Sequence, residues 1–182
     1  MTRGNEDLKK PVKKTGKENQ PHYNSGIMKF VLIDKILSLD SGKELKAVKN
    51  VSLAEEYLAD HFPTFPVLPG VLLLQGLIES ASWLVRQKQN FSNSMVLLEQ
   101  ARNVKYKSFL SPAMQIEYTV KVKTIEDNVS SFTGTGVCGN VSIIEARFAL
   151  RHFNLSDTNP AMAAVDAVVV ENLRKRFALL TH

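Results

Sequence analysis

The sequence predicts an α+β fold in which an antiparallel sheet wraps around one long buried helix, with an amphipathic helix at the C-terminal end. Two observations support this prediction. Apolar and polar residues alternate, as in half-buried strands, over residues 103–107, 115–123 and 129–136. Residues 71–89 contain no proline and are apolar on most faces, which is typical of a buried helix. Packing the sheet on the helix buries the apolar surface of both.

Before the helix, two segments enter the fold. Residues 27–39 are rich in apolar residues without a clear period, so they predict either a strand or a short helix. A turn at Ser41-Gly42-Lys43 is followed by residues 44–51, which alternate as a strand does. Residues 55–58 then lead into a loop that contains Pro63, Pro66 and Pro69.

After the helix, residues 95–99 begin a second group of strands. The longest alternating run, 115–123, places Ile116, Tyr118, Val120 and Val122 on its buried face. A hairpin turn at Gly139-Asn140 leads to a last strand over 141–152. Apolar residues three to four apart in 161–180 predict the amphipathic helix, which begins after a turn at 157–160. We expect it to pack on the domain or on a sister subunit in preference to the alternative, a membrane surface.

We expect the 182 residues to form one domain with two extensions. The expected division is a disordered basic tail over 1–25, a domain over 26–155 and a helical extension over 156–182. The tail holds six basic and three acidic residues, so it carries +3 of the formal net charge of +5. This concentration of charge argues against a nucleic-acid-binding domain. An alternative role for the tail is to dock an acidic partner electrostatically.

Composition also bears on location and on metals. The sequence has no apolar run near the roughly 18 residues that a membrane span needs, and its polar start has no signal core. Cys138 is the single cysteine, so no internal disulfide can form and a reducing cytoplasm is expected. The histidines, His22, His61, His152 and His182, show no ligand spacing with one another, so we expect no metal site.

The most informative stretch is the proline-containing loop and the helix start that follows it. The prolines fix φ near −65° and make the approach rigid, and this approach carries His61. A helix that opens at Pro69-Gly70 leaves backbone N–H groups unpaired at the positive end of its macrodipole. An oxygen that gains negative charge is stabilised there, and Gly70 has no Cβ to keep a ligand carbonyl away.

A polar stripe runs along the same helix. Gln75, Glu79, Ser82 and Arg86 lie four, three and four residues apart, which places them within one narrow arc. On an otherwise apolar helix, such a stripe needs hydrogen-bonding partners or a wet cavity. Glu79 is therefore either a functional carboxylate or one tied to a hydroxyl or to Arg86.

Residues 61–74 resemble the signature of the (3R)-hydroxyacyl-acyl carrier protein dehydratases of fatty-acid synthesis, a hotdog-fold family. The signature has His-Phe-Pro, a further Pro and then Pro-Gly-Val-Leu, which match His61 to Pro63, Pro66 and Pro69 to Leu72. Segments 32–36, 47–51 and 103–112 also look like the family, so the resemblance covers about residues 28–153. It implies a hotdog fold and a homodimer in which the histidine and an acidic residue come from different subunits.

The resemblance also implies a reaction, the removal of water from a 3-hydroxyacyl thioester to give the trans-2-enoyl thioester. The acyl group is carried on the phosphopantetheine arm of acyl carrier protein or coenzyme A, without a further cofactor. His61 matches the base, and the backbone N–H of Gly70 or Val71 matches the donor to the thioester carbonyl. Phe62 and Pro69 belong to the same motif and are expected to contact substrate.

The chain departs from the family at the position fourteen residues after His61, which is Gln75 instead of an acid. A carboxamide can hydrogen-bond a hydroxyl group but cannot give it a proton. Glu79 lies one turn further along and is the candidate to supply the acid through a water. Two alternatives remain: a non-catalytic partner that binds acyl thioesters or acyl carrier protein, and a thioesterase in which Glu79 activates water.

Overall fold

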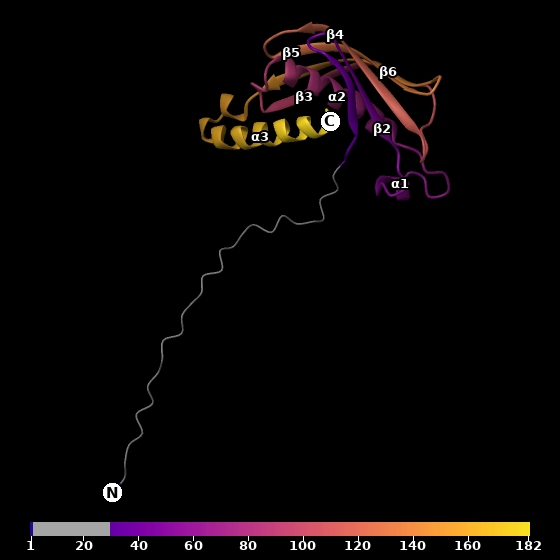
Figure 1. The fold of residues 1–182 in the computed structure, drawn as a ribbon, viewed down its shortest axis with the longest axis horizontal. Helices are drawn as coiled ribbons and strands as arrows, with labels where there is room; N and C mark the ends of the chain where they lie inside the picture. The colour runs from indigo at the N-terminus through magenta and orange to yellow at the C-terminus, as the bar shows by residue number, and fades with distance from the viewer. Residues whose placement is uncertain (2–29) are drawn as a thin grey trace.

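The computed structural model describes Met1 and residues 30–182, so the expected tail lies, apart from Met1, outside the described residues. A six-stranded sheet curves around the long helix α2, and α3 lies on the open side of the sheet (Figure 1). Two short 3₁₀ helices, Leu155–Asp157 and Pro160–Met162, precede α3. The elements are β1 (Lys35–Asp40), β2 (Glu44–Asn50), α1 (Tyr57–Asp60), α2 (Gly70–Lys88), β3 (Met95–Tyr106), β4 (Gln115–Ile125), β5 (Val129–Cys138), β6 (Val141–Phe153) and α3 (Ala163–Leu180).

All neighbouring strands are antiparallel, in the order β1-β2-β4-β5-β6-β3. β1 and β3 are therefore the edges, while β4 and β5 lie in the middle. One face of the sheet packs on α2, and the other faces solvent. The expected α+β fold, with a sheet around one buried helix, is confirmed, and it is the hotdog arrangement.

The core lies between α2 and the inner face of the sheet. Ile116, Tyr118 and Val120 of β4 are completely buried, as the alternation predicted. α2 lies close to this strand, because a Cβ added at Gly76 would come within 2.4 Å of the Tyr118 ring. Only glycine fits at this position without moving the helix or the ring.

Two elements differ from the sequence-based expectation. Residues 95–99 and 103–106 belong to one strand, β3, instead of two, and Lys107 lies just beyond its end. Its alternation is broken by register shifts against β6 and by Asn103, which has a φ of 52°. The first strand, β1, begins only at Lys35, while Leu32 and Ile33 before it are buried without joining the sheet.

α3 packs on the domain, which was one of the two expected positions. The Phe177 ring lies 5.9 Å from the Trp83 ring and 5.5 Å from the Phe91 ring, measured between centroids. The Arg174 guanidinium covers the same Phe91 ring at 4.6 Å.

Among the described helices, none is long and apolar enough to cross a membrane.

The start of α3 is fixed by Asp166. Its carboxylate accepts hydrogen bonds from the Ser94 hydroxyl and from the backbone N–H groups of Leu155 and Ser156. Burial raises the pKa of this carboxyl, but the bonds from Ser94 and Ser156 outweigh burial and lower the pKa from 3.8 to about 2. Because the folded-state pKa is depressed, the stabilisation is complete above pH 4 and is lost as the pH falls toward 2.

We therefore expect α3 to detach from the domain in this acidic range. Trp83 is the single tryptophan and contacts α3, so its fluorescence should report the detachment. At pH 7, Asp166→Asn should lower the melting temperature by about 2–4 °C. The control Glu171→Gln, which removes a charge from the exposed side of α3, should have little effect. An equal loss in both variants would contradict this account of Asp166.

Candidate functional site

His61 lies in the loop after α1, half-buried, with its ring fixed by the chain that follows. Its Nδ1 lies 3.0 Å from the backbone carbonyl oxygen of Val67. A carbonyl oxygen can only accept a hydrogen bond, so Nδ1 carries the proton. The other ring nitrogen, Nε2, then has a lone pair, and His61 can act as a base there.

The N-terminus of α2 lies next to this histidine. The Pro69 carbonyl oxygen accepts hydrogen bonds from the N–H groups of Leu72 at 2.9 Å and Leu73 at 3.2 Å. Within the described part of the chain, the N–H groups of Gly70 and Val71 have no acceptor. Both donors lie at the positive end of a helix of 19 residues, where an oxygen with growing negative charge is stabilised.

His61 and Gly70 line one cavity of about 200 Å³. The Tyr106 ring lies over Gly70, so close that a Cβ added at Gly70 would come within 3.1 Å of it. Any larger residue than glycine would narrow the cavity or displace Tyr106. The remaining lining residues are Val67, Leu68, Leu73, Lys107, Ser108 and Phe109.

Tyr106 to Phe109 are site residues that no sequence motif indicated. These residues lie at and just after the end of β3, more than thirty positions after Gly70, and no local pattern marks them as lining residues. The available signal was the segment 103–112, whose likeness to the family placed it in the same domain as the histidine motif.

Four of the predicted residues lie beside the cavity but do not line it. The Phe62 ring stacks on the His61 ring with centroids 4.4 Å apart. Pro69 provides the carbonyl at the helix start, and Val71 points outward with 70% of its surface exposed. Gln75 is exposed one helical turn beyond Val71, on the same side of α2.

Glu79 also lies away from the cavity, and its partner is on α3. Its Oε1 accepts a hydrogen bond from Nη2 of Arg176 at 2.9 Å. Burial raises the pKa of Glu79 above its usual 4.5, and the Arg176 guanidinium offsets part of this rise. Arg86, which the sequence analysis offered as a partner, instead donates to the backbone carbonyls of Asn93 and Ser94.

Large apolar side chains are exposed around the cavity. Phe65 and Phe109 pack edge to face with centroids 6.1 Å apart, and Phe109 is 67% exposed. Phe62, Val71 and Tyr106 are exposed in the same region. We call Phe62, Phe65, Val71, Tyr106 and Phe109 the apolar rim. Exposed apolar side chains gathered around a cavity favour a contact site for a ligand or for another protein.

No group of three or more His, Cys, Asp or Glu side chains is placed to hold a metal ion in the described residues. The candidate site combines a histidine with backbone N–H donors at the start of α2. Comparison with known proteins identifies the family of this chain. A family model described as the FabA-like domain matches residues 26–147. The chain belongs to this FabA-like family.

The chain aligns with most of the length of several curated relatives. The 3-hydroxyacyl-[acyl-carrier-protein] dehydratase FabZ of Fusobacterium nucleatum is 32% identical over 120 residues, which are 65% of this chain and 84% of the relative. The FabZ protein of Wolbachia pipientis wMel is 28% identical over 117 residues, 64% of this chain and 82% of the relative. These relatives bear a dehydratase name in common.

The fold also resembles solved structures at low identity. The dehydratase heterocomplex ApeI:P from Xenorhabdus doucetiae matches with a TM-score of 0.61 and 14% identity, over 73% of this chain and 90% of the other. The smu.793 protein from Streptococcus mutans matches with a TM-score of 0.51 and 11% identity, over 71% and 95%. At such identities, the likeness supports the hotdog fold alone.

Proposed function

We propose that this FabA-like protein is a 3-hydroxyacyl-acyl carrier protein dehydratase, which removes water to give the trans-2-enoyl thioester. The observation that carries the proposal is the meeting of two groups in one cavity. His61 has a free Nε2 there, and the start of α2 offers backbone N–H groups without an acceptor. The names of the FabZ relatives support the same reaction.

The reaction needs three groups, and the site offers two of them directly. Nε2 of His61 takes the proton from the carbon next to the thioester carbonyl. The N–H groups of Gly70 and Val71 donate to the carbonyl oxygen as it becomes enolate-like. The bond between C3 and its hydroxyl then breaks, and the hydroxyl leaves as water after it receives a proton.

The third group, the acid, is where this chain departs from its family. Glu79 is held by Arg176 and does not line the cavity, so it reaches the substrate only through an intervening water. His61, once protonated at Nε2, already lies in the cavity. We therefore assign the return of the proton to His61 itself, and to Gln75 the hydrogen bond that orients the leaving hydroxyl.

A second copy of the chain is part of this proposal. The cavity of about 200 Å³ is smaller than the roughly 300–1,000 Å³ that ligand sites usually have. Gln75 does not line it in the single chain, while the apolar rim beside Gln75 is exposed. A homodimer that buries the rim can enlarge the cavity into a closed site and place Gln75 of one subunit beside His61 of the other.

The proposal also covers the acyl carrier, the cofactor and the cellular location. The acyl group arrives on the phosphopantetheine arm of acyl carrier protein, or on coenzyme A, and acid–base chemistry by His61 uses no further cofactor. The single cysteine suits a reducing compartment, so we place the protein in the cytoplasm.

The test is to incubate the purified full-length protein with a 3-hydroxyacyl thioester of acyl carrier protein and to follow two products. Formation of the enoyl thioester supports the dehydratase. Release of free thiol without an enoyl product would overturn it in favour of the thioesterase. Absence of both products, with retained binding of the acyl carrier protein, would favour the non-catalytic partner. The observation that favours this second candidate is Gln75, because its carboxamide cannot give a proton to the leaving hydroxyl.

A further inference from the structure

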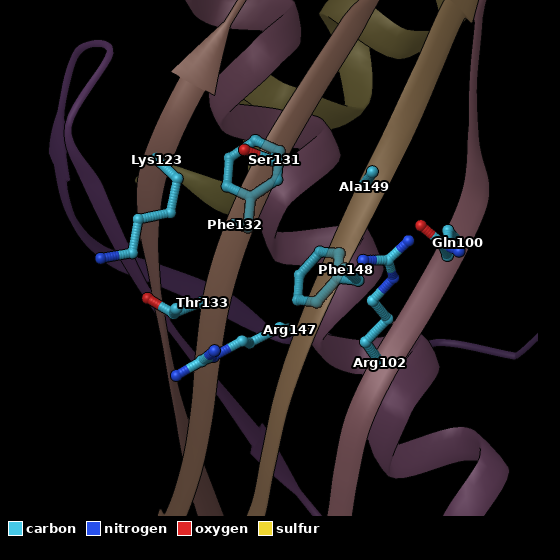
Figure 2. A pocket seen from close by; sticks show the side chains of 9 residues that line it. All are labelled: Gln100, Arg102, Lys123, Ser131, Phe132, Thr133, Arg147, Phe148 and Ala149. Atoms are coloured by element: carbon cyan, nitrogen blue, oxygen red, sulfur yellow. The ribbon is translucent and has the colours of Figure 1, made fainter.

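The outer face of the sheet, opposite α2, carries a second hollow of about 510 Å³. Its floor consists of the short side chains of Ser131, Thr133 and Ala149, on the neighbouring strands β5 and β6. Longer side chains stand around this floor. Figure 2 shows Arg102 and Lys123 on opposite sides of the hollow, with Arg147 between them. We call this hollow the outer-face site.

Three cations and no carboxylate line the outer-face site. Arg102 on β3 is the direct cross-strand neighbour of Arg147 on β6, which in turn lies opposite Thr133 on β5. Like charges directly opposite each other in a sheet repel and destabilise it. An anion bound between them would remove this repulsion.

Several other cations in or next to this sheet have carboxylate partners, unlike those of the outer-face site. Lys46 pairs with Glu117 across β2 and β4, Lys121 pairs with Glu44, and Lys107 pairs with Glu145. In the part of the chain that the structure describes, Arg102, Lys123 and Arg147 form no ion pair. The available charge at the outer-face site is therefore positive and not neutralised by the protein.

The residue types of the outer-face site suit phosphate groups. Guanidinium groups bind phosphate oxygens through two parallel hydrogen bonds, and the hydroxyls of Ser131 and Thr133 can donate to the remaining oxygens. Arg102 and Lys123 lie on β3 and β4, which β6 and β5 separate. Three strand spacings correspond to about 14 Å between backbones, which is wider than a single phosphate needs.

We propose that the outer-face site binds a small molecule that carries two phosphate groups. Arg147 lies in the middle and contacts both phosphates, while Arg102 binds one of them and Lys123 binds the other. The site lies on the opposite side of the sheet from α2, and none of its lining residues lines the cavity of His61. The proposal is therefore independent of the dehydratase reaction.

The test is calorimetric titration of the full-length protein with pyrophosphate, adenosine diphosphate and orthophosphate. Both diphosphates should bind at least about tenfold more tightly than orthophosphate, because they engage more than one cation. Tighter binding of adenosine diphosphate than of pyrophosphate would identify an organic diphosphate as the ligand, and the reverse order the free anion. Equal affinity for orthophosphate and pyrophosphate would overturn the assignment of two phosphates.

Variants locate the binding. Arg147→Gln and Lys123→Gln should each weaken pyrophosphate binding about tenfold or more. The matched control is Lys46→Gln, which removes one positive charge from the same sheet, at a lysine that already has a partner. All variants keep the same basic tail, so its contribution cancels. An equal loss of affinity in Lys46→Gln would show general charge attraction and overturn the site.

A second readout separates binding from folding. Without an anion, Arg147→Gln should melt at a higher temperature than the parent, because it removes the repulsion with Arg102. Pyrophosphate should raise the melting temperature of the parent more than that of Arg147→Gln at the same concentration. A parent whose melting temperature does not respond to pyrophosphate would refute the proposal.

Discussion

His61→Ala should lower kcat/KM for dehydration of a 3-hydroxyacyl thioester by about 10³-fold or more, which corresponds to about 4 kcal/mol of transition-state stabilisation. In our proposal His61 both takes the proton from the substrate and returns one to the leaving hydroxyl, so its loss removes two functions at once. The N–H groups of Gly70 and Val71 should remain in place, because they are backbone groups of α2. Binding of the thioester should therefore persist.

The measurement is steady-state kinetics with a melting curve of each variant. His61 makes one hydrogen bond, to Val67, and its ring is half-buried, so the melting temperature should change little. His182→Ala is the matched control, because it makes the same replacement at an exposed C-terminal position. Retention of more than about a tenth of the activity in a folded His61→Ala protein would be inconsistent with a base at this position.

The sequence predicted the parts of the fold in which local pattern and final environment agree. β4 alternates strictly, lies in the middle of the sheet and packs one face on α2, so its period could be read directly. β3 could not be read in this way. It lies at the sheet edge, its register against β6 shifts twice, and Asn103 adopts a positive φ, so its alternation changes face within one strand.

The candidate site shows the same division. His61 and Gly70 are close in sequence, and the rigid loop between them made their meeting predictable. The contact between Glu79 and Arg176 joins residues 97 positions apart. Neither residue has a local signal that selects the other, and Arg86 is nearer in sequence. Such long-range pairs depend on how α3 packs, which a single sequence does not specify.

Gln75→Glu should raise kcat for dehydration by about 10- to 100-fold if a homodimer brings this residue to His61 of the other subunit. A carboxylic acid can protonate the leaving hydroxyl, and a positioned general acid contributes about 10²–10⁴ in rate. The carboxamide of Gln75 supplies a hydrogen bond only. Because Gln75 is exposed in the single chain, the change should not disturb the fold.

Two further variants decide between the candidate acids. Gln75→Leu keeps a similar size without hydrogen-bonding groups and should lower kcat below that of the parent. Glu79→Gln should leave kcat nearly unchanged, because Glu79 binds Arg176 and does not line the cavity. The same change should weaken the docking of α3 on the domain.

If Glu79→Gln abolishes turnover and Gln75→Glu has no effect, the proton comes from Glu79 through water, and the role assigned to Gln75 is wrong. If the parent is inactive and Gln75→Glu is active, the scaffold is intact and lacks only its acid. The natural protein is then the non-catalytic partner. Its Gln75 can hydrogen-bond the substrate hydroxyl, whereas the acid in Gln75→Glu can also protonate this hydroxyl so that it leaves as water.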